Sequence, residues 1–340
     1  MASGTIPATF SELYTDLSNR VKLQTGITAT QDQAKRYIDI ANHEIYIGAS
    51  EKLPWAKRQA TITTHPEYRT GTVAVTVGST TVTGTSTLWT TTNSYGQANA
   101  RAGGKIVFAG RHEVYRVTAV GGAGSLTISP AFIGTTDSET TYRYFEDEYA
   151  VATDFLRPYF TKDLDGSGEV PLIGDRDFEM RFPRNSNTSS RILAATMVDF
   201  AVSGNTTPIR KLRIGPPSRD AALIPYTYIT SYIATSSAGA EKVSLTADAD
   251  EPIIPRRYRV VLVLHALYNW YRDQKDDGRS QEAKLEFEQK RAEMVGDQEI
   301  GQQRTSVAPR AGYVGRARRP YRRGAGTYWD TTGEFFRRER

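Results

Sequence analysis

The chain has no cysteine among its 340 residues, which excludes disulfides and thiolate metal sites. Long apolar runs are missing too, since no stretch approaches the roughly 20 apolar residues of a membrane helix. Residues 1–10 lack the basic start and apolar run of a signal peptide. We therefore expect a soluble protein, synthesised in a cytoplasm, without membrane contacts and stabilised by packing or oligomerisation.

Enzyme motifs occur only as fragments. The Gly103–Lys105 segment lacks the first glycine and the final hydroxyl residue of a phosphate-binding loop. His43 and His112 are each followed by glutamate, as at the start of a zinc-protease motif. Ile47 and Arg116 stand where that motif requires its second histidine. No serine stands between glycines at the nucleophile-elbow spacing. We expect no catalytic residues, no metal, no cofactor and no enzymatic activity.

One segment resembles half of a calcium-binding loop. The matching residues are Asp163, Asp165, Ser167 and Gly168. Gly174 occupies the position of the bidentate acid, and Pro171 interrupts the loop. An ordinary acidic turn therefore explains the pattern better than a calcium site.

Charge is concentrated at the C-terminal end. Residues 301–340 contain ten Arg and three acidic residues, a net charge of +7, and since the whole chain carries +5, residues 1–300 carry −2. The run from 304 to 323 has seven Arg and no acid, interleaved with Tyr313 and Tyr321. Three interpretations remain open: a solvated tail, docking on an acidic protein groove, or DNA binding.

Two helices are predicted near the N-terminus. Thr9 with Glu12 forms a capping-box pattern before a short helix. Thr30 with Gln33 forms the same pattern before an amphipathic helix that Gly48 is expected to end.

Two more helices are predicted towards the other end. Prolines precede a strongly apolar helix over about 256–276, which should be buried. A charged helix should follow over about 280–295, and residues 301–340 should form an extended basic tail.

Two regions have the alternation of β-strands. Residues 71–145 are rich in Gly, Thr, Ser and Val and predict an inserted antiparallel β-sandwich or barrel whose ends lie close together. The stretches 192–200, 209–214 and 225–234 predict a three-stranded meander. The fold class is therefore α+β. The expected organisation is a core of residues 1–70 and 146–300, an insertion at 71–145 and a tail at 301–340.

Short motifs stand in a fixed order among these segments. Two helices are followed by Leu53-Pro54-Trp55 and a strand, then the β insertion, then the segment from Leu212 to Pro217. Ile254-Pro255-Arg256-Arg257-Tyr258 then opens a long helix. This order resembles head-to-tail adaptor (connector) proteins of tailed bacteriophages. The insertion looks like phage β modules, with Leu88-Trp89 and Gly104-Lys105-Ile106 among its motifs. The resemblance covers about residues 5–300.

The resemblance implies a non-enzymatic structural protein of the virion. Such proteins form a ring of twelve copies beneath the portal, continue the channel for genomic DNA and support the next tail or nozzle protein. In this family the C-terminal segment commonly docks on the portal. The docking residues expected here are Arg310, Tyr313, Arg316, Arg318, Arg319, Tyr321, Arg322, Arg323, Tyr328 and Trp329.

Two other classes of function remain open. Trp89 and Tyr95 in the Thr-rich insertion suggest a tail-fibre or carbohydrate-binding protein. The Arg-rich tail alone suggests a protein that binds or processes nucleic acid, although the chain lacks a plausible acidic metal cluster.

Overall fold

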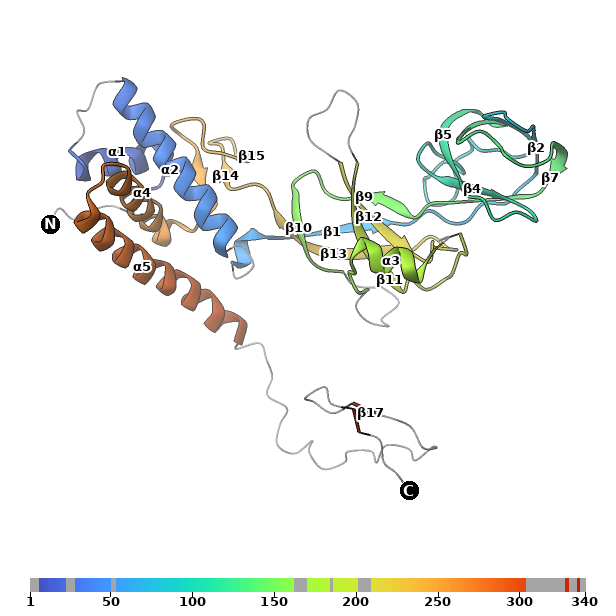
Figure 1. Cartoon of the computed structure of the whole chain (residues 1–340). Coiled ribbons are helices and arrows are strands. Elements are labelled where there is room, and N and C mark those ends of the chain that lie inside the picture. Colours follow the sequence, from blue (N-terminus) through green and yellow to red (C-terminus); the bar gives the residue numbers. More distant parts are fainter. Residues whose placement is uncertain are drawn as a thin grey trace. The chain divides into compact units, whose positions relative to one another are not determined.

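A computed structural model shows a protein of mixed helices and antiparallel sheets, which confirms the expected α+β class (Figure 1). The structure describes residues 6–22, 28–49, 53–161, 170–183, 186–200, 209–303, 328–329 and 335–336. The chain divides into two units, residues 1–295 and 296–340. Each unit is described by itself.

The helices of the described residues are α1 (Phe10–Arg20), α2 (Thr28–Ala49), α3 (Asp175–Arg181), α4 (Val260–Asp273) and α5 (Asp277–Gln303), with 3-10 turns η2 (Pro54–Ala56) and η3 (Arg256–Tyr258). The predicted capping box at α1 is confirmed, because the Thr9 hydroxyl accepts the Glu12 N–H at 3.3 Å and the Glu12 carboxylate accepts the Thr9 N–H. The predicted cap at Thr30 is wrong. Thr30 is the third residue of α2, which begins at Thr28. The spacing of Thr30 and Gln33 occurs inside a helix as well as at its start, so the pattern alone did not locate the first residue.

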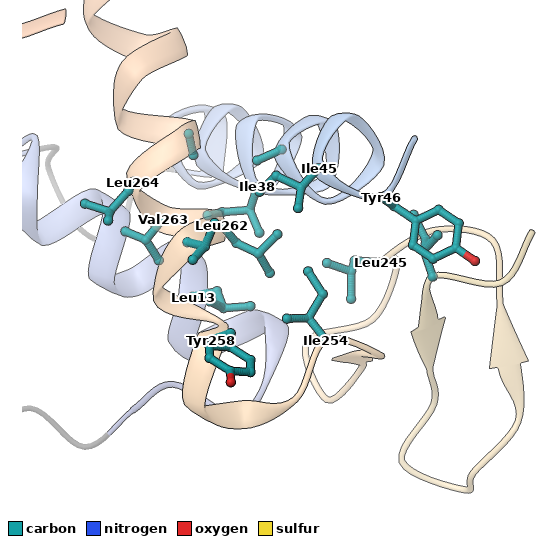
Figure 2. Close-up of a cluster of buried hydrophobic side chains, with 14 of the residues drawn as sticks. Leu13, Ile38, Ile45, Tyr46, Leu245, Ile254, Tyr258, Leu262, Val263 and Leu264 are labelled. Carbon is teal, nitrogen blue, oxygen red and sulfur yellow. The ribbon is translucent and has the colours of Figure 1, made fainter. Parts of the chain in front are cut away.

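Helices α1, α2, α4 and α5 enclose an apolar cluster to which η2, β13 and the residues before α4 also contribute. Figure 2 shows Leu13 of α1, Ile38 and Ile45 of α2 and Leu262 of α4 converging with Ile254. Leu13, Ile38 and Leu262 are fully buried, and each such side chain contributes about 1.5–3 kcal/mol to folding. The apolar helix predicted over 256–276 is thus buried, as expected. We call this group the helical cluster.

A first three-stranded sheet has the order β1 (Lys57–Thr63), β13 (Leu223–Thr230), β10 (Phe155–Thr161), and a second has the order β11 (Ala194–Phe200), β12 (Ile209–Gly215), β9 (Glu148–Ala150). A third small sheet has the order β15 (Glu241–Lys242), β14 (Ala234–Thr235), β16 (Glu251–Pro252).

The predicted meander of three consecutive strands is therefore wrong. β11 and β12 pair with each other, but the third strand of their sheet is β9. Pro216 and Pro217 follow β12 and have no N–H to continue a ladder. Strand β13 instead lies between β1 and β10, where Tyr228 stacks on Phe155 with ring centroids 5.5 Å apart.

The insertion forms one seven-stranded antiparallel sheet that curls into a half-barrel, where the sequence predicted a sandwich or barrel. Its strands are β2 (Thr72–Val75), β3 (Thr81–Thr85), β4 (Lys105–Phe108), β5 (Tyr115–Gly122), β6 (Ser125–Ser129), β7 (Asp137–Thr140) and β8 (Tyr142–Phe145), in the order β7-β2-β3-β6-β5-β4-β8. We call it the curled sheet. Tyr68 pairs with Tyr144 of the edge strand β8 through two backbone hydrogen bonds of 2.9 and 2.8 Å, so the chain enters and leaves the curled sheet side by side.

In the second unit, the backbone of β17 (Tyr328–Trp329) pairs antiparallel with β18 (Phe335–Phe336). The remaining residues of the predicted tail after Gln303 lie outside the described residues.

Candidate functional site

The docking residues predicted in the tail are not brought into a site by the described structure. Arg310, Tyr313, Arg316, Arg318, Arg319, Tyr321, Arg322 and Arg323 lie outside the described residues. Tyr328 and Trp329 are described as backbone of β17 only. Their predicted role stays a prediction.

The residues that resemble a calcium loop, Asp163–Gly168, also lie outside the described residues. Across the part of the chain that the structure describes, no group of three or more His, Asp or Glu side chains could hold a metal ion. Among the same residues, no helix is both long enough and apolar enough to cross a membrane.

The histidines of the zinc-protease fragments stand apart from one another. His43 lies on α2 beside Asp39 at 3.8 Å, and His112 is exposed in the turn before β5. The phosphate-loop fragment has a packing explanation, because a Cβ atom on Gly104 would clash with the ring of Tyr144. None of these fragments forms a cluster of reactive side chains.

Two other histidines, both with little exposed surface, make short polar contacts. The His65 ring nitrogens lie 2.6 Å from the Pro66 carbonyl oxygen and 2.8 Å from that of Ala98. His265 of α4 lies 2.5 Å from the Glu44 carboxylate of α2. Burial raises the pKa of Glu44, but the hydrogen bonds from His265 and Asn269 outweigh that effect and hold it below its usual value. The contacts of His65 with Ala98 and of His265 with Glu44 join segments that are distant in sequence.

Buried charges gather where the chain leaves β8. The Arg101 guanidinium holds the Glu146 carboxylate at 2.9 and 2.5 Å, and the Tyr144 hydroxyl donates to the same carboxylate at 2.7 Å. Hydrogen bonding to Glu146 raises the pKa of Arg101. Burial raises the pKa of Tyr144 well above its usual value. Asp147, which is 1% exposed, accepts from Lys105 at 2.8 Å and from Arg213 at 3.3 Å. Because these carboxylates already have cationic partners, the cluster has the character of a structural ion-pair network.

The aromatic pair that suggested carbohydrate binding is split by the fold. Trp89 is fully buried in the curled sheet, where its indole N–H donates to the Tyr142 hydroxyl at 2.9 Å. Tyr95 is 57% exposed. The two rings therefore do not offer a shared exposed platform to a sugar, and the expectation drawn from Trp89 is corrected.

Helix α5 presents a largely exposed surface. Among its described side chains in 277–297, the buried ones form one narrow stripe of Ser280, Ala283, Phe287 and Met294. Phe287 contacts His265 with ring centroids 4.4 Å apart, and Arg291 donates to the Gly48 carbonyl at 3.1 Å. Leu285 is 69% exposed. Most of the helix is therefore open to contact, and it leads directly to the Arg-rich run.

A cleft of about 250 Å³ opens at the β4 and β8 edge of the curled sheet. Three arginines line it, Arg69, Arg111 and Arg143, together with Phe108, Gly110 and Tyr142. Sequence reasoning missed these arginines, because they are 42 and 32 positions apart and only the folded sheet brings them together.

The segments that carry the resemblance to phage adaptors partly meet in the fold. Trp55 stacks on Tyr258 with ring centroids 6.5 Å apart and planes at 21°. Leu53 and Ile254 are buried in the same helical cluster. No protein-family model matches this chain, and no curated protein shows significant sequence similarity to it.

Proposed function

We propose that this chain is a head-to-tail adaptor of a tailed bacteriophage, a structural protein without enzymatic activity. In this proposal twelve copies form a ring between the portal and the next tail or nozzle protein. The ring continues the channel through which genomic DNA passes, and the protein resides at the head-tail interface of the virion.

The observation that carries the proposal is the meeting of two distant segments in one core. The adaptor-like segments 53–55 and 254–258 pack together through Trp55 and Tyr258. Residues 53–55 follow α2 and residues 254–258 precede α4, and both segments contribute to the same packed cluster as these two helices. The resemblance therefore concerns parts that are also adjacent in space, and the curled sheet is an insertion between them.

Helix α5 supports the assembly part of the proposal. A ring protomer contacts two neighbours through different surfaces, and each stable interface buries about 800 Å² per partner. The exposed face of α5, with Leu285 among charged side chains, is a suitable surface for one such neighbour. Its mixed charges also suit the polar rim of an interface.

The Arg-rich segment is proposed to dock on the portal. Arginine binds carboxylates through two parallel hydrogen bonds, and buried aromatic side chains often supply most of the binding energy. With seven Arg between 304 and 323 and the aromatic residues Tyr321 and Trp329, the segment has both components. An acidic surface on the portal is the complementary partner.

Truncation after Gln303 tests the docking role. The chain and portal would be co-expressed from the genome that encodes them, and their complex measured by size exclusion and electron microscopy. We expect the truncated chain to fold but to lose stable joining to the portal. A matched control replaces Arg337, Arg338 and Arg340 with Gln, which lowers charge outside the 304–323 run and should leave joining intact.

Other outcomes would support other functions. Binding of the full chain to DNA that falls steeply with salt, together with normal portal joining by the truncated chain, would favour a nucleic-acid role for the segment. Specific binding of the chain to glycans would favour the tail-fibre alternative. Either result would count against portal docking.

A further inference from the structure

We propose that the arginine cleft of the curled sheet binds a carboxylate side chain, Asp or Glu, of a partner protein. The cleft is the one lined by Arg69, Arg111 and Arg143 at the edge formed by β4 and β8. This inference concerns a surface separate from the Arg-rich tail and does not depend on it.

Two of the arginines are forced together by strand register. Tyr68 pairs with Tyr144 in antiparallel register, so continuing that register by one residue places Arg69 opposite Arg143. Like charges directly across two strands destabilise a sheet. Glu67 offsets the charge of Arg69 in part, and an anion beside Arg143 would lower the remaining repulsion between the two guanidinium groups.

Of the three arginines of the cleft, Arg69 and Arg111 make hydrogen bonds, whereas Arg143 keeps a donor without a partner. Arg69 pairs with Glu67 through Nε, and Arg111 donates to the Thr135 carbonyl at 3.1 Å and to its hydroxyl at 2.9 Å. Within the described residues, the Arg143 Nε–H is buried and has no hydrogen-bond partner. A buried donor without a partner destabilises a protein, and an acceptor that reached it would restore the missing hydrogen bond.

Arg111 is held in position from a second side as well. Its guanidinium lies over the ring of Phe132, 4.9 Å from the centroid. Burial, followed by the nearby charge of Arg69, lowers the pKa of Arg143 from its usual value. The contacts with Phe132 and Thr135 hold Arg111 in place before an anion arrives, so little ordering of that side chain is required on binding.

The shape of the cleft favours a protein carboxylate over a nucleic-acid phosphate. The cleft is a small concavity of about 250 Å³, and Phe108 and Tyr142 also line it, so it suits a single acidic side chain with apolar carbons. Nucleic-acid surfaces are recognised by many cations spread along the backbone. Residues 1–300 carry a net charge of −2, which does not suit that mode.

The test uses the full chain and two small probes. N-acetylglutamate N-methylamide represents an acidic side chain, and dimethyl phosphate represents a phosphodiester. Each is titrated while the arginine Nε–H signals are followed by NMR. We expect the glutamate probe to shift the Arg143 signal and to bind more tightly than dimethyl phosphate.

Substitutions assign the site. Arg143→Gln should weaken binding of the glutamate probe by about tenfold or more, and Arg143→Lys should weaken it less, since the charge stays and the planar fork is lost. Arg116→Gln, at an exposed arginine of β5 outside the cleft, should leave binding unchanged. If Arg143→Gln does not fold, Arg69→Gln, at a side chain 60% exposed, provides the same test.

Several results would overturn the proposal. They are no shift of any cleft arginine at the highest soluble probe concentration, equal or tighter binding of dimethyl phosphate, and unchanged binding by a folded Arg143→Gln or Arg69→Gln variant.

Discussion

The curled sheet takes its buried side chains from one stretch of chain, residues 73–144, whereas the helical cluster takes them from residues 10–56 and 229–294. The curled sheet can therefore form its core from contacts within about seventy residues. The helical cluster needs both ends of the body at once. This difference explains how a self-contained sheet can stand inside a fold whose own core spans the insertion.

The two cores also differ in chemistry. The curled sheet buries Trp89, Tyr142 and Tyr144, whose polar atoms are all hydrogen-bonded, as when the Tyr142 hydroxyl donates to the Thr70 carbonyl at 2.7 Å. The helical cluster depends more on aliphatic side chains such as Leu13 and Leu262. In the curled sheet, large aromatic side chains fill the core and their polar atoms form hydrogen bonds. In the helical cluster, aliphatic side chains fill the space between the helices.

Removal of the curled sheet is the largest change that tests the independence of the two regions. Replacing residues 69–143 with Asn-Gly joins Tyr68 to Tyr144, which already form a hydrogen-bonded pair, through a two-residue turn. Glu146→Gln accompanies the excision because Arg101 is removed. We expect the helical cluster to keep its helical circular dichroism and a cooperative thermal transition. Loss of both would mean that the sheet is an integral part of the body.

Core truncations should have smaller and separable effects. Trp89→Ala should destabilise the curled sheet by about 3–5 kcal/mol, and the matched change Leu262→Ala should destabilise the helical cluster by about 2–5 kcal/mol. Hydrogen exchange resolved by segment is the measurement. Each change should raise exchange mainly in its own region, and a common rise across both regions after Trp89→Ala would remove the distinction between the two cores.

The smallest expected loss of stability is in the loop of residues 246–250, which contacts the first residue of α1. Asp250 is buried, and burial raises its pKa, but the N–H groups of Ala247 and Thr246 and the Lys242 ammonium lower it to about 2. The Asp250 carbonyl also accepts the first N–H of α1 from Phe10 at 2.7 Å. Because the folded pKa is depressed, the stabilisation is present above the unfolded value near 3.9 and is lost as pH falls towards about 2.

Asp250→Asn should therefore lower the free energy of unfolding by about 1–2 kcal/mol at pH 7, and the difference from the unchanged chain should shrink between pH 4 and pH 2. Denaturant unfolding at several pH values provides the measurement. A difference that is constant with pH would show that the charge of Asp250 does not contribute.

Features with local causes could be predicted from the sequence, and features with distant causes could not. The cap formed by Thr9 and Glu12 depends on four consecutive residues and is confirmed. The partners of β13 depend on strands more than sixty positions away, so the predicted meander is wrong. The arginine cleft required the register of Tyr68 with Tyr144, which no local pattern contains.

The sequence also did not show which of the candidate sugar-binding aromatic residues is buried. Trp89 and Tyr95 look alike in sequence as aromatic residues in a Thr-rich stretch, yet one is fully buried and the other is 57% exposed. Both residues lie in the connection between β3 and β4, outside the strands, where the sequence has no periodic pattern that shows which side chain packs inside. The tail residues predicted from composition, Arg310 to Arg323, remain predictions.

The most direct test of the proposed function is localisation in the virion. If the chain is the adaptor of a tailed phage, as proposed, cryo-electron microscopy of that phage's particles shows its density at the head-tail vertex, with the α1, α2 and α4 helices and the curled sheet as recognisable features. The proposal predicts a ring of twelve copies directly beneath the portal. Density of this chain only in fibres, or no copy of it in mature particles, would contradict the proposal.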